Sequence, residues 1–322
     1  MGQSLVPALL AQGHEVVCAV RPQSVHILER MVQDRRDRKR LTLFQVSGLG
    51  PDTAWRPGLD GVDTVIHLAG LAHVRTRRPM DRFSDFLWGN YGATLSLGLQ
   101  ASEAGVRRFI FISTIGVNGQ VTEKGRPFTE EQAPEPENAY SVTKLKAEHG
   151  LMALAAHRRM SVIILRPPLV YGPFAKANFL SLMNLVATGM PLPFLHVENR
   201  KSFIGLGNLV DVILTCLAYR GAGGRLFLVS DGQDVSTKEF ILRLARAMGK
   251  PPRLFPMPKT PARFLLGAAG KQKIYDQLWE DLTIDNSRLC RELGWSPKFS
   301  MDQELARSAQ WYKDTQRRET RI

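Results

Sequence analysis

The chain has 322 residues, with 43 lysines and arginines against 30 aspartates and glutamates, and therefore a formal net charge of +13. Its 44% hydrophobic and 23% charged residues are an ordinary globular composition, which excludes a disordered or low-complexity protein. The length suits one large α/β unit or two domains. No apolar run approaches the roughly 20 residues that a membrane helix needs, so we expect no membrane insertion.

The sequence also bears on compartment and metal content. Cys18, Cys216 and Cys290 are scattered and odd in number, which is typical of reduced thiols rather than of a disulfide framework or a metal site. The N-terminus lacks the basic segment of a secretory signal. We therefore expect a cytoplasmic protein with no bound metal.

Apolar, β-branched runs alternate with helix-length segments through the first half of the chain, and one further helix and strand follow at 208–229. Strands are predicted at 15–20, 41–46, 63–69, 108–113, 161–165 and 225–229. Helices are predicted at 5–12, 25–36, 83–104, 140–158 and 208–219. Because the strand runs are continuously apolar rather than alternating, they indicate a sheet covered on both faces. The order predicts an α/β fold with a doubly wound parallel sheet.

The pattern changes after about residue 167, where Pro167-Pro168, Pro173, Pro191 and Pro193 punctuate shorter elements. Further helices are predicted at 237–248 and 302–316. We expect residues 1–167 to form one α/β domain, to which the segment at about 206–230 returns. Residues 168–322 would mainly form a smaller, mixed domain.

A tyrosine and a lysine stand four residues apart at the start of the helix predicted for 140–158. Residues at positions i and i+4 share one helix face, so Tyr140 and Lys144 can point into one site. A tyrosine ordinarily loses its proton near pH 10, and a nearby cation favours the phenolate. The pair is a candidate for proton transfer; the alternative is a surface tyrosine and lysine with no such role.

Two predicted strands end in residues suited to a ligand site. Ser113 and Thr114 end the strand at 108–113, and His67-Leu-Ala-Gly70 ends the strand at 63–69. Ligands of open α/β sheets bind outside the carboxyl ends of the strands. A hydroxyl there can bind a substrate oxygen, and small residues let a dinucleotide approach the backbone. The alternatives are a hydroxyl that satisfies backbone groups and a plain turn.

Together these residues resemble the extended short-chain dehydrogenase/reductase superfamily, and within it the NAD-dependent epimerase/dehydratase family of nucleotide-sugar enzymes. The resemblance covers nearly the whole chain. It implies a Rossmann-like, NAD(P)-binding domain at 1–167, to which the segment at about 206–230 returns, and a mainly substrate-binding domain at 168–322. Asn90-Tyr-Gly-Ala-Thr94 is similar to the family's N-x-x-G-T segment, and Leu165-Arg-Pro-Pro-Leu-Val-Tyr-Gly-Pro173 is similar to its R-P-x-x-x-Y-G-P loop. The segments at 112–119, 176–179 and 202–211 resemble the bacterial branch that makes surface-polysaccharide precursors. That branch contains UDP-sugar 4-epimerases and the 4-keto reductases that form UDP-N-acetylquinovosamine.

The resemblance implies roles for named residues. Its catalytic residues would be Thr114, Tyr140 and Lys144, with Lys144 also bonded to the nicotinamide ribose. Its cofactor-binding residues would be Gly2, Arg21, Leu68, Ala69, Gly70, Asn90, Ser113, Tyr140, Lys144 and Pro167. Its substrate-binding residues would be Thr114, Asn178, Phe179, Arg200 and Lys201. Asn178 would contact the diphosphate, and Arg200 or Lys201 would neutralise a phosphate. The alternatives are a helix cap for Asn178 and solvated charge for the basic pair.

The expected cofactor is NADP or NAD. NAD-specific Rossmann domains usually place a carboxylate at the end of the second strand, where it binds the ribose hydroxyls. Here Val20 is followed by Arg21, and an arginine can stack on adenine or pair with a 2′-phosphate. This favours NADP(H).

The glycine-rich loop that normally opens a dinucleotide fold is largely absent from the sequence. Gly2 matches the last glycine of G-x-x-G-x-x-G, so the first strand and the first two glycines of the family pattern would precede residue 1. We expect either a start codon assigned too late or a truncated chain. The alternative is a protein that manages without this motif.

The resemblance implies hydride transfer at C4 of a UDP-linked hexose, by a 4-keto reductase or a 4-epimerase of bacterial surface-polysaccharide biosynthesis. The alternative is a non-catalytic dinucleotide-binding or regulatory protein, which would be expected to lose the catalytic tyrosine or lysine. Nucleic-acid binding is not expected, because the basic clusters at 35–40, 75–78, 107–108 and 317–318 are dispersed and lack interleaved aromatic residues. The resemblance implies two partners, a nucleotide sugar and a second copy of the chain that binds through the helices at 83–104 and 140–158. The alternative is that these apolar-faced helices are buried within one chain.

Overall fold

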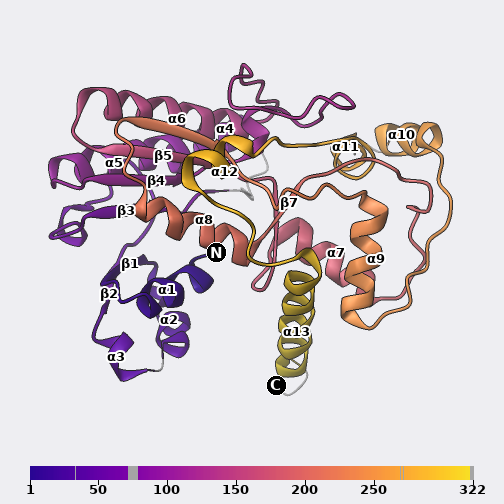
Figure 1. Ribbon diagram of the computed structural model, residues 1–322, viewed down its shortest axis with the longest axis horizontal. Coiled ribbons are helices and arrows are strands. Elements are labelled where there is room, and N and C mark those ends of the chain that lie inside the picture. Colours follow the sequence, from indigo (N-terminus) through magenta and orange to yellow (C-terminus); the bar gives the residue numbers. More distant parts are fainter. Residues whose placement is uncertain (33, 72–78, 269, 271, 320–322) are drawn as a thin grey trace. The chain divides into compact units, whose positions relative to one another are not determined.

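The computed structural model describes residues 1–32, 34–71, 79–268, 270 and 272–319, so the basic cluster at 75–78 lies outside the described residues (Figure 1). The chain divides into two compact units. Unit 1 comprises Met1–Val117, Pro134–Arg166 and Val212–Phe227. Unit 2 comprises Asn118–Ala133, Pro167–Asp211 and Leu228–Ile322.

All six predicted strands are confirmed, and their pairing is parallel where the register is defined. They are β1 (Val16–Val20), β2 (Leu41–Gln45), β3 (Thr64–His67), β4 (Arg108–Ile112), β5 (Ser161–Arg166) and β8 (Gly224–Leu228). One sheet has the order β3-β4-β5-β8, and β1 and β2 form a separate pair. In the register of the larger sheet, His67 lies beside Phe111 and Ile112 beside Leu165. The carboxyl ends of β3, β4 and β5 therefore lie at one edge.

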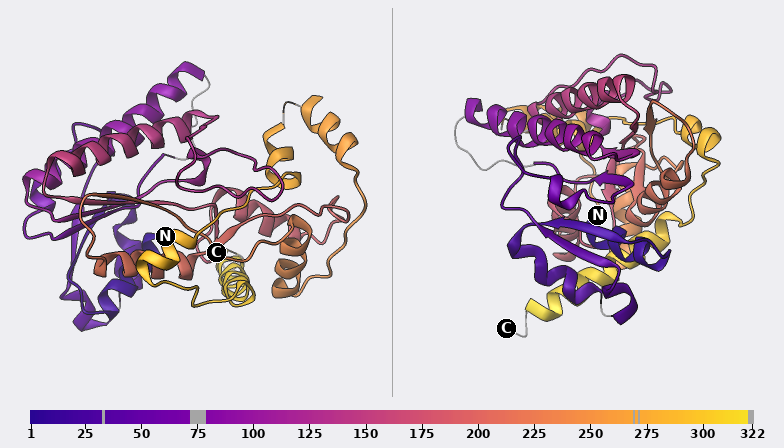
Figure 2. Two further views of the ribbon diagram at one scale, coloured as in Figure 1. Left: turned by 45° about the horizontal axis from the view of Figure 1, so that its top comes forward. Right: turned by 90° about the vertical axis from the view of Figure 1, so that its left-hand side faces the viewer.

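Helices of unit 1 cover the larger sheet and the strand pair. They are α1 (Gly2–Ala11), α2 (Val25–Met31), α3 (Arg35–Arg38), α4 (Pro79–Phe86), α5 (Ala93–Glu103) and α6 (Ala139–His157), together with the 212–218 part of α8 (Leu206–Ala218). Figure 2 shows α5 and α6 side by side. Gly98 permits this approach, because a Cβ there would lie 2.8 Å from Leu151 Cδ2.

A hydrophobic core joins the larger sheet to α5 and α6. It includes Leu97, Ala101, Phe109, Phe111, Ala147, Leu151, Val162 and Ile164. Burying one such large apolar side chain contributes about 1.5–3 kcal/mol, so this core holds the strand ends and α6 in a fixed relationship.

Two predicted helices are interrupted in the structure. The helix predicted at 25–36 ends at Met31, and α3 begins anew because Asp34 Oδ1 accepts the backbone N–H groups of Arg36 and Asp37. The helix predicted at 83–104 contains a π-helical turn at Leu87–Gly92. The Leu71 side chain packs against this turn at Gly89, where a Cβ would clash with Leu71 Cδ1.

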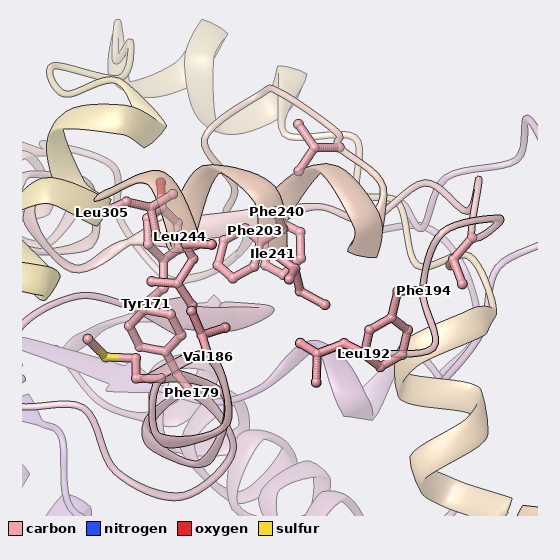
Figure 3. Close-up of a cluster of buried hydrophobic side chains, with 14 of the residues drawn as sticks. Tyr171, Phe179, Val186, Leu192, Phe194, Phe203, Phe240, Ile241, Leu244 and Leu305 are labelled. Atoms are coloured by element: carbon pink, nitrogen blue, oxygen red, sulfur yellow. The ribbon is translucent and has the colours of Figure 1, made fainter. Parts of the chain in front are cut away.

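Unit 2 contains more helix than the sequence predicted. The parallel pair β6 (Leu169–Tyr171) and β7 (Phe203–Gly205) is joined by α7 (Ala177–Ala187), α9 (Thr237–Met248), α10 (Lys259–Ala268), α11 (Gln272–Trp279), α12 (Ser287–Leu293) and α13 (Met301–Glu319). Its core is aromatic: the rings of Phe203 and Phe240 stack with centroids 4.2 Å apart, and Tyr171 lies edge-on to both (Figure 3). Among the helices of the described ranges, none is long and apolar enough to cross a membrane.

Candidate active site

Lys144 is buried at the centre of the candidate site. It stands on the second turn of α6 and is 2% exposed. Its Nζ donates to the backbone oxygen of Ile112 at 2.7 Å and lies 4.1 Å from the centroid of the Phe111 ring. A buried ammonium needs such partners, because removal from water disfavours its charge. The contacts join α6 to the carboxyl end of β4.

The surroundings of Lys144 lower the pKa of its amine into the neutral range. Burial lowers the pKa of Lys144 to about 7, and the negative charge of Glu148 acts in the opposite direction. The amine can therefore exist in both protonation states near neutral pH.

Tyr140 stands one helical turn before Lys144, with its ring edge-on to Phe86 at 6.3 Å between centroids. Burial raises the pKa of Tyr140 above its usual value. The sequence predicted a pKa lowered by the nearby cation, and in the protein alone this is wrong. The physical reason is that burial disfavours the charged phenolate.

The two hydroxyls at the end of β4 have different partners. Ser113 Oγ donates to Glu148 Oε1 and is 4% exposed, so its proton is held within the protein. Thr114 Oγ1 accepts the backbone N–H of Gly116 at 3.2 Å. That bond leaves the Thr114 proton for an acceptor outside the turn, and Thr114 is therefore the hydroxyl suited to a substrate oxygen.

The loop after β3 is tied to α6 through Asn90. The Asn90 amide accepts the backbone N–H of Leu71 at 2.7 Å and donates to the backbone oxygen of Leu71 at 3.0 Å. It also donates to Thr143 Oγ1 at 3.3 Å. Asn90 thus holds the loop beside Lys144, and its amide atoms have protein partners.

The end of β3 fits the approach of a dinucleotide. Leu68 is half-buried, and Ala69 and Gly70 are exposed. A Cβ at Gly70 would lie 3.3 Å from Asn90 Oδ1 and 3.5 Å from Lys144 Nζ, so the Gly70 backbone lies close to both groups. A group bound at the exposed Gly70 backbone would therefore lie near the Lys144 amine.

Two of the predicted cofactor-binding residues, Gly2 and Arg21, stand near the start of the sequence. A Cβ at Gly2, the first residue of α1, would lie 3.8 Å from Leu68 Cδ1, so the start of α1 adjoins the end of β3. The N-terminus of a helix favours phosphate groups. Arg21 directly follows β1 in extended backbone and is exposed.

The remaining predicted residues belong to unit 2. Pro167 follows β5 and is buried, and Asn178 is exposed in the first turn of α7. The Phe179 ring is 1% exposed and packs against Tyr171 and Phe240. Phe179 is therefore a core residue, and only its backbone N–H, which belongs to the first turn of α7, is suited to a ligand.

Arg200 and Lys201 differ in their surroundings. The Arg200 side chain is 67% exposed and lies 3.8 Å from Asp234. Lys201 is buried, and its Nζ donates to the backbone oxygen of Asp276 at 3.3 Å. Burial lowers the pKa of Lys201 to about 8, against the charges of Asp281, Glu280 and Asp276. Of the two, Arg200 is the one able to meet a phosphate.

The comparison with known families decides the class of the chain. Residues 1–229 match the model of the NAD-dependent epimerase/dehydratase family. The chain belongs to this family. It is therefore an enzyme of a family that uses NAD(P), and its Rossmann-like fold is that of the family.

Relatives of this family member act on nucleotide sugars. It is 38% identical over 299 residues to a UDP-glucose 4-epimerase of Vibrio cholerae, covering 92% of this chain and 91% of that protein. It is 28% identical over 255 residues to a GDP-6-deoxy-D-mannose reductase of Pseudomonas aeruginosa, and the match covers 76% of this chain and 78% of that protein. Its fold is similar to that of a UDP-glucuronic acid 4-epimerase of Bacillus cereus in complex with NAD, with a TM-score of 0.76 and 20% sequence identity. The match covers 98% of this chain and 95% of that chain.

Two site residues of this epimerase/dehydratase family member were not predicted from the sequence. Glu148 and Arg166 form a buried ion pair beneath the strand ends. The available signals were the i to i+4 spacing of Lys144 and Glu148 and an arginine at the end of an apolar strand. Neither signal reveals that the two side chains meet, because that contact depends on how α6 packs on β5.

Proposed function

We propose that this protein is an NAD(P)-dependent UDP-hexose 4-epimerase. The observation that carries the proposal is the 38% identity, over 92% of the chain, with the UDP-glucose 4-epimerase of Vibrio cholerae. The arrangement of Thr114, Tyr140 and Lys144 at the carboxyl end of β4 supports it. Retention of these three residues argues against a non-catalytic dinucleotide-binding protein.

The bound dinucleotide supplies a hydride acceptor and donor for C4 of the sugar. Tyr140 accepts the proton of the C4 hydroxyl when C4 is oxidised and returns it when C4 is reduced on the opposite face. Thr114 donates a hydrogen bond to the C4 oxygen. Lys144, when protonated, favours the Tyr140 phenolate and so reduces the energy needed to form it.

The two units are proposed to divide the binding. Unit 1 would hold the dinucleotide at the ends of β1 and β3, with Gly2, Arg21, Gly70 and their neighbours against it. Unit 2 would hold the nucleotide sugar, through Arg200 and the N–H groups of the first turn of α7. The UDP-hexose product would serve surface-polysaccharide biosynthesis.

The proposed choice of dinucleotide is based on Arg21. An exposed arginine after β1, with no carboxylate beside it, suits a 2′-phosphate and so favours NADP. The solved relative from Bacillus cereus binds NAD. Release of the bound dinucleotide from the purified protein and its identification by mass spectrometry decides between them.

A 4-keto reductase is the second candidate, because a reductase of Pseudomonas aeruginosa is 28% identical to the chain. The two reactions share their residues and differ in stoichiometry. The epimerase is expected to interconvert UDP-glucose and UDP-galactose with no NAD(P)H added. Consumption of one NADH or NADPH per 4-keto sugar, with no interconversion, would instead establish the reductase.

A homodimer is also proposed, through the helices α4 to α6. Trp88 is 54% exposed, Phe83 39% and Leu99 37%, so apolar side chains remain uncovered on this part of unit 1. A second copy of the chain would bury them. Light scattering should give twice the monomer mass, and a Trp88→Lys variant should give the monomer mass. A monomeric wild-type protein contradicts the dimer.

A further inference from the structure

We propose that Glu148, clamped by Arg166, is the positioning residue of the catalytic site. It fixes the end of β4 against α6 and supplies the counter-charge of Lys144. The inference rests on the proposed function, because it concerns the groups assigned to proton transfer at C4.

The carboxylate of Glu148 has protein partners on both of its oxygens. Arg166 Nε donates to Oε1 at 3.0 Å, and Arg166 Nη2 donates to Oε2 at 2.5 Å. Ser113 Oγ also donates to Oε1. The side chains of Arg166 and Glu148 are 4% and 3% exposed. Two parallel N–H···O bonds from one guanidinium fix the orientation of a carboxylate.

These contacts connect three elements of unit 1. Glu148 belongs to α6, Arg166 is the last residue of β5, and Ser113 follows β4 directly. Thr114, the proposed ligand of the C4 oxygen, is the next residue along the chain. The Glu148 contacts therefore set where the peptide of Thr114 lies relative to the helix that carries Tyr140.

Glu148 also determines the charge near Lys144. Among the residues that the structure describes, the titratable and charged groups around Lys144 are Tyr140 and Glu148 on α6, His67 at the end of β3, and Arg166 of β5 behind Glu148. Burial lowers the pKa of His67 to about 3, so the imidazole is neutral at neutral pH. Glu148 is thus the charge that favours the protonated amine, against the burial that lowers the pKa of Lys144.

Stability alone does not account for a buried ion pair at this place. Well-packed neutral side chains of similar volume often serve as well, because desolvation offsets the attraction between the charges. The pair lies one helical turn from a lysine whose pKa is about 7, where its removal alters the charge of that lysine. A functional role follows from this position.

The test compares Glu148→Gln with the double variant Glu148→Gln/Arg166→Met. Glu148→Gln removes the carboxylate but leaves Arg166 without its counter-charge. The double variant also removes that charge, so we expect it to fold with a melting temperature close to that of the wild type. Asp63→Asn is the control, because Asp63 pairs with Arg107 in the same unit with both side chains more than 70% exposed.

Two readouts separate positioning from a purely structural role. One is the pH at which Lys144 titrates, followed by NMR of the holoprotein labelled in its lysine side chains, with Lys144→Arg used for assignment. The other is the alkaline limb of the kcat profile for UDP-glucose. In Glu148→Gln, we expect the Lys144 titration and the alkaline limb of the kcat profile to move to lower pH by about one unit or more. In the double variant both should move in the same direction, and in Asp63→Asn both should stay unchanged.

The possible outcomes each decide the question. Three results would each overturn the inference, because the pair would then serve structure alone. They are an unchanged Lys144 titration in Glu148→Gln, a wild-type pH profile in the double variant, and a double variant that fails to fold. A wild-type protein that converts no UDP-hexose while Lys144 titration still shifts would instead contradict the proposed function and leave the role of Glu148 toward Lys144 in place.

Discussion

Lys144 Nζ donates to the backbone oxygen of Ile112 at 2.7 Å, which joins the helix of Tyr140 to the strand that leads into Thr114. The bond forms between protein groups alone, so the relative position of the proposed proton-transfer groups is fixed before any ligand binds. Preorganisation of this kind spares the reaction the cost of arranging those groups.

The buried Lys144 amine should make the stability of the protein depend on pH. Its pKa is 10.5 in the unfolded chain and about 7 in the folded protein, so folding releases a proton between these values. The penalty is fully present below pH 7 and is relieved as the pH rises toward 10.5, by about 1.4 kcal/mol per pH unit. Lys144→Met should therefore be more stable than the wild type near pH 7, and this gain should shrink by pH 10. Urea unfolding across this range measures it; a constant difference would contradict the burial of a neutralisable amine.

His67 should contribute to acid sensitivity. Its ring stacks on Phe111, its Nε2 lies 2.9 Å from Thr94 Oγ1, and burial lowers its pKa from 6.5 to about 3. Between these values the unfolded chain binds a proton that the folded protein does not, so stability falls as the pH drops from 6.5 toward 3. In His67→Gln this part of the loss should disappear. Urea unfolding from pH 7 to pH 4 measures this. The free energy of unfolding should fall more steeply with decreasing pH in the wild type than in His67→Gln.

Tyr171 should stabilise unit 2 through one hydrogen bond. Its hydroxyl donates to Asp231 Oδ2 at 2.7 Å, and the side chain is fully buried. Tyr171→Phe should cost about 1.5–3 kcal/mol, the range for hydrogen bonds to charged groups. The matched control is Tyr312→Phe, whose hydroxyl bonds to Asn184 at an exposed position and should change stability by less than about 0.5 kcal/mol. Equal losses in the two variants would show that burial of the bond is unimportant.

Tyr140→Phe should abolish proton transfer and leave binding intact. General acid–base groups contribute about 10²–10⁴-fold to rates, so kcat should fall by that factor. Phe keeps the contact with the Phe86 ring, and the dinucleotide should still copurify at the wild-type ratio. Stopped-flow and steady-state kinetics on UDP-glucose give kcat, and absorbance of the released dinucleotide gives occupancy. Full activity of this variant would rule out Tyr140 as the proton carrier.

Sequence reasoning predicted the regular elements whose signals are local. The strands followed from continuous apolar runs, and α9 was predicted with its observed bounds of Thr237–Met248. The reason is that Ser236 caps its start through the N–H of Glu239 and Gly249 ends it with φ 68°. These signals lie within a few residues of the ends they determine.

The elements that were missed depend on tertiary contacts. The π-helical turn at Leu87–Gly92 arises where Leu71 packs against Gly89 and where Asn90 bonds to the loop after β3. The pairing of Glu148 with Arg166 likewise requires α6 to lie on β5. Helix propensities along the sequence carry no information about either contact.

The roles of the candidate site residues stay predictions, and the structure corrects one part of their electrostatics. The sequence placed Thr114, Tyr140 and Lys144 at one edge of the sheet. It gave the wrong direction for the pKa of Tyr140, because the degree of burial is set by packing around Phe86 and the end of β4.

The fate of the hydrogen on C4 tests the proposed chemistry most directly. UDP-glucose labelled with deuterium at C4 is incubated with the purified protein in ordinary water, and the UDP-galactose formed is analysed by NMR and mass spectrometry. Because the hydrogen leaves C4 as a hydride and returns to the same carbon within one active site, deuterium should be retained at C4 of the product. Loss of the label to solvent, or formation of no UDP-galactose at all, would contradict epimerisation by hydride transfer at C4.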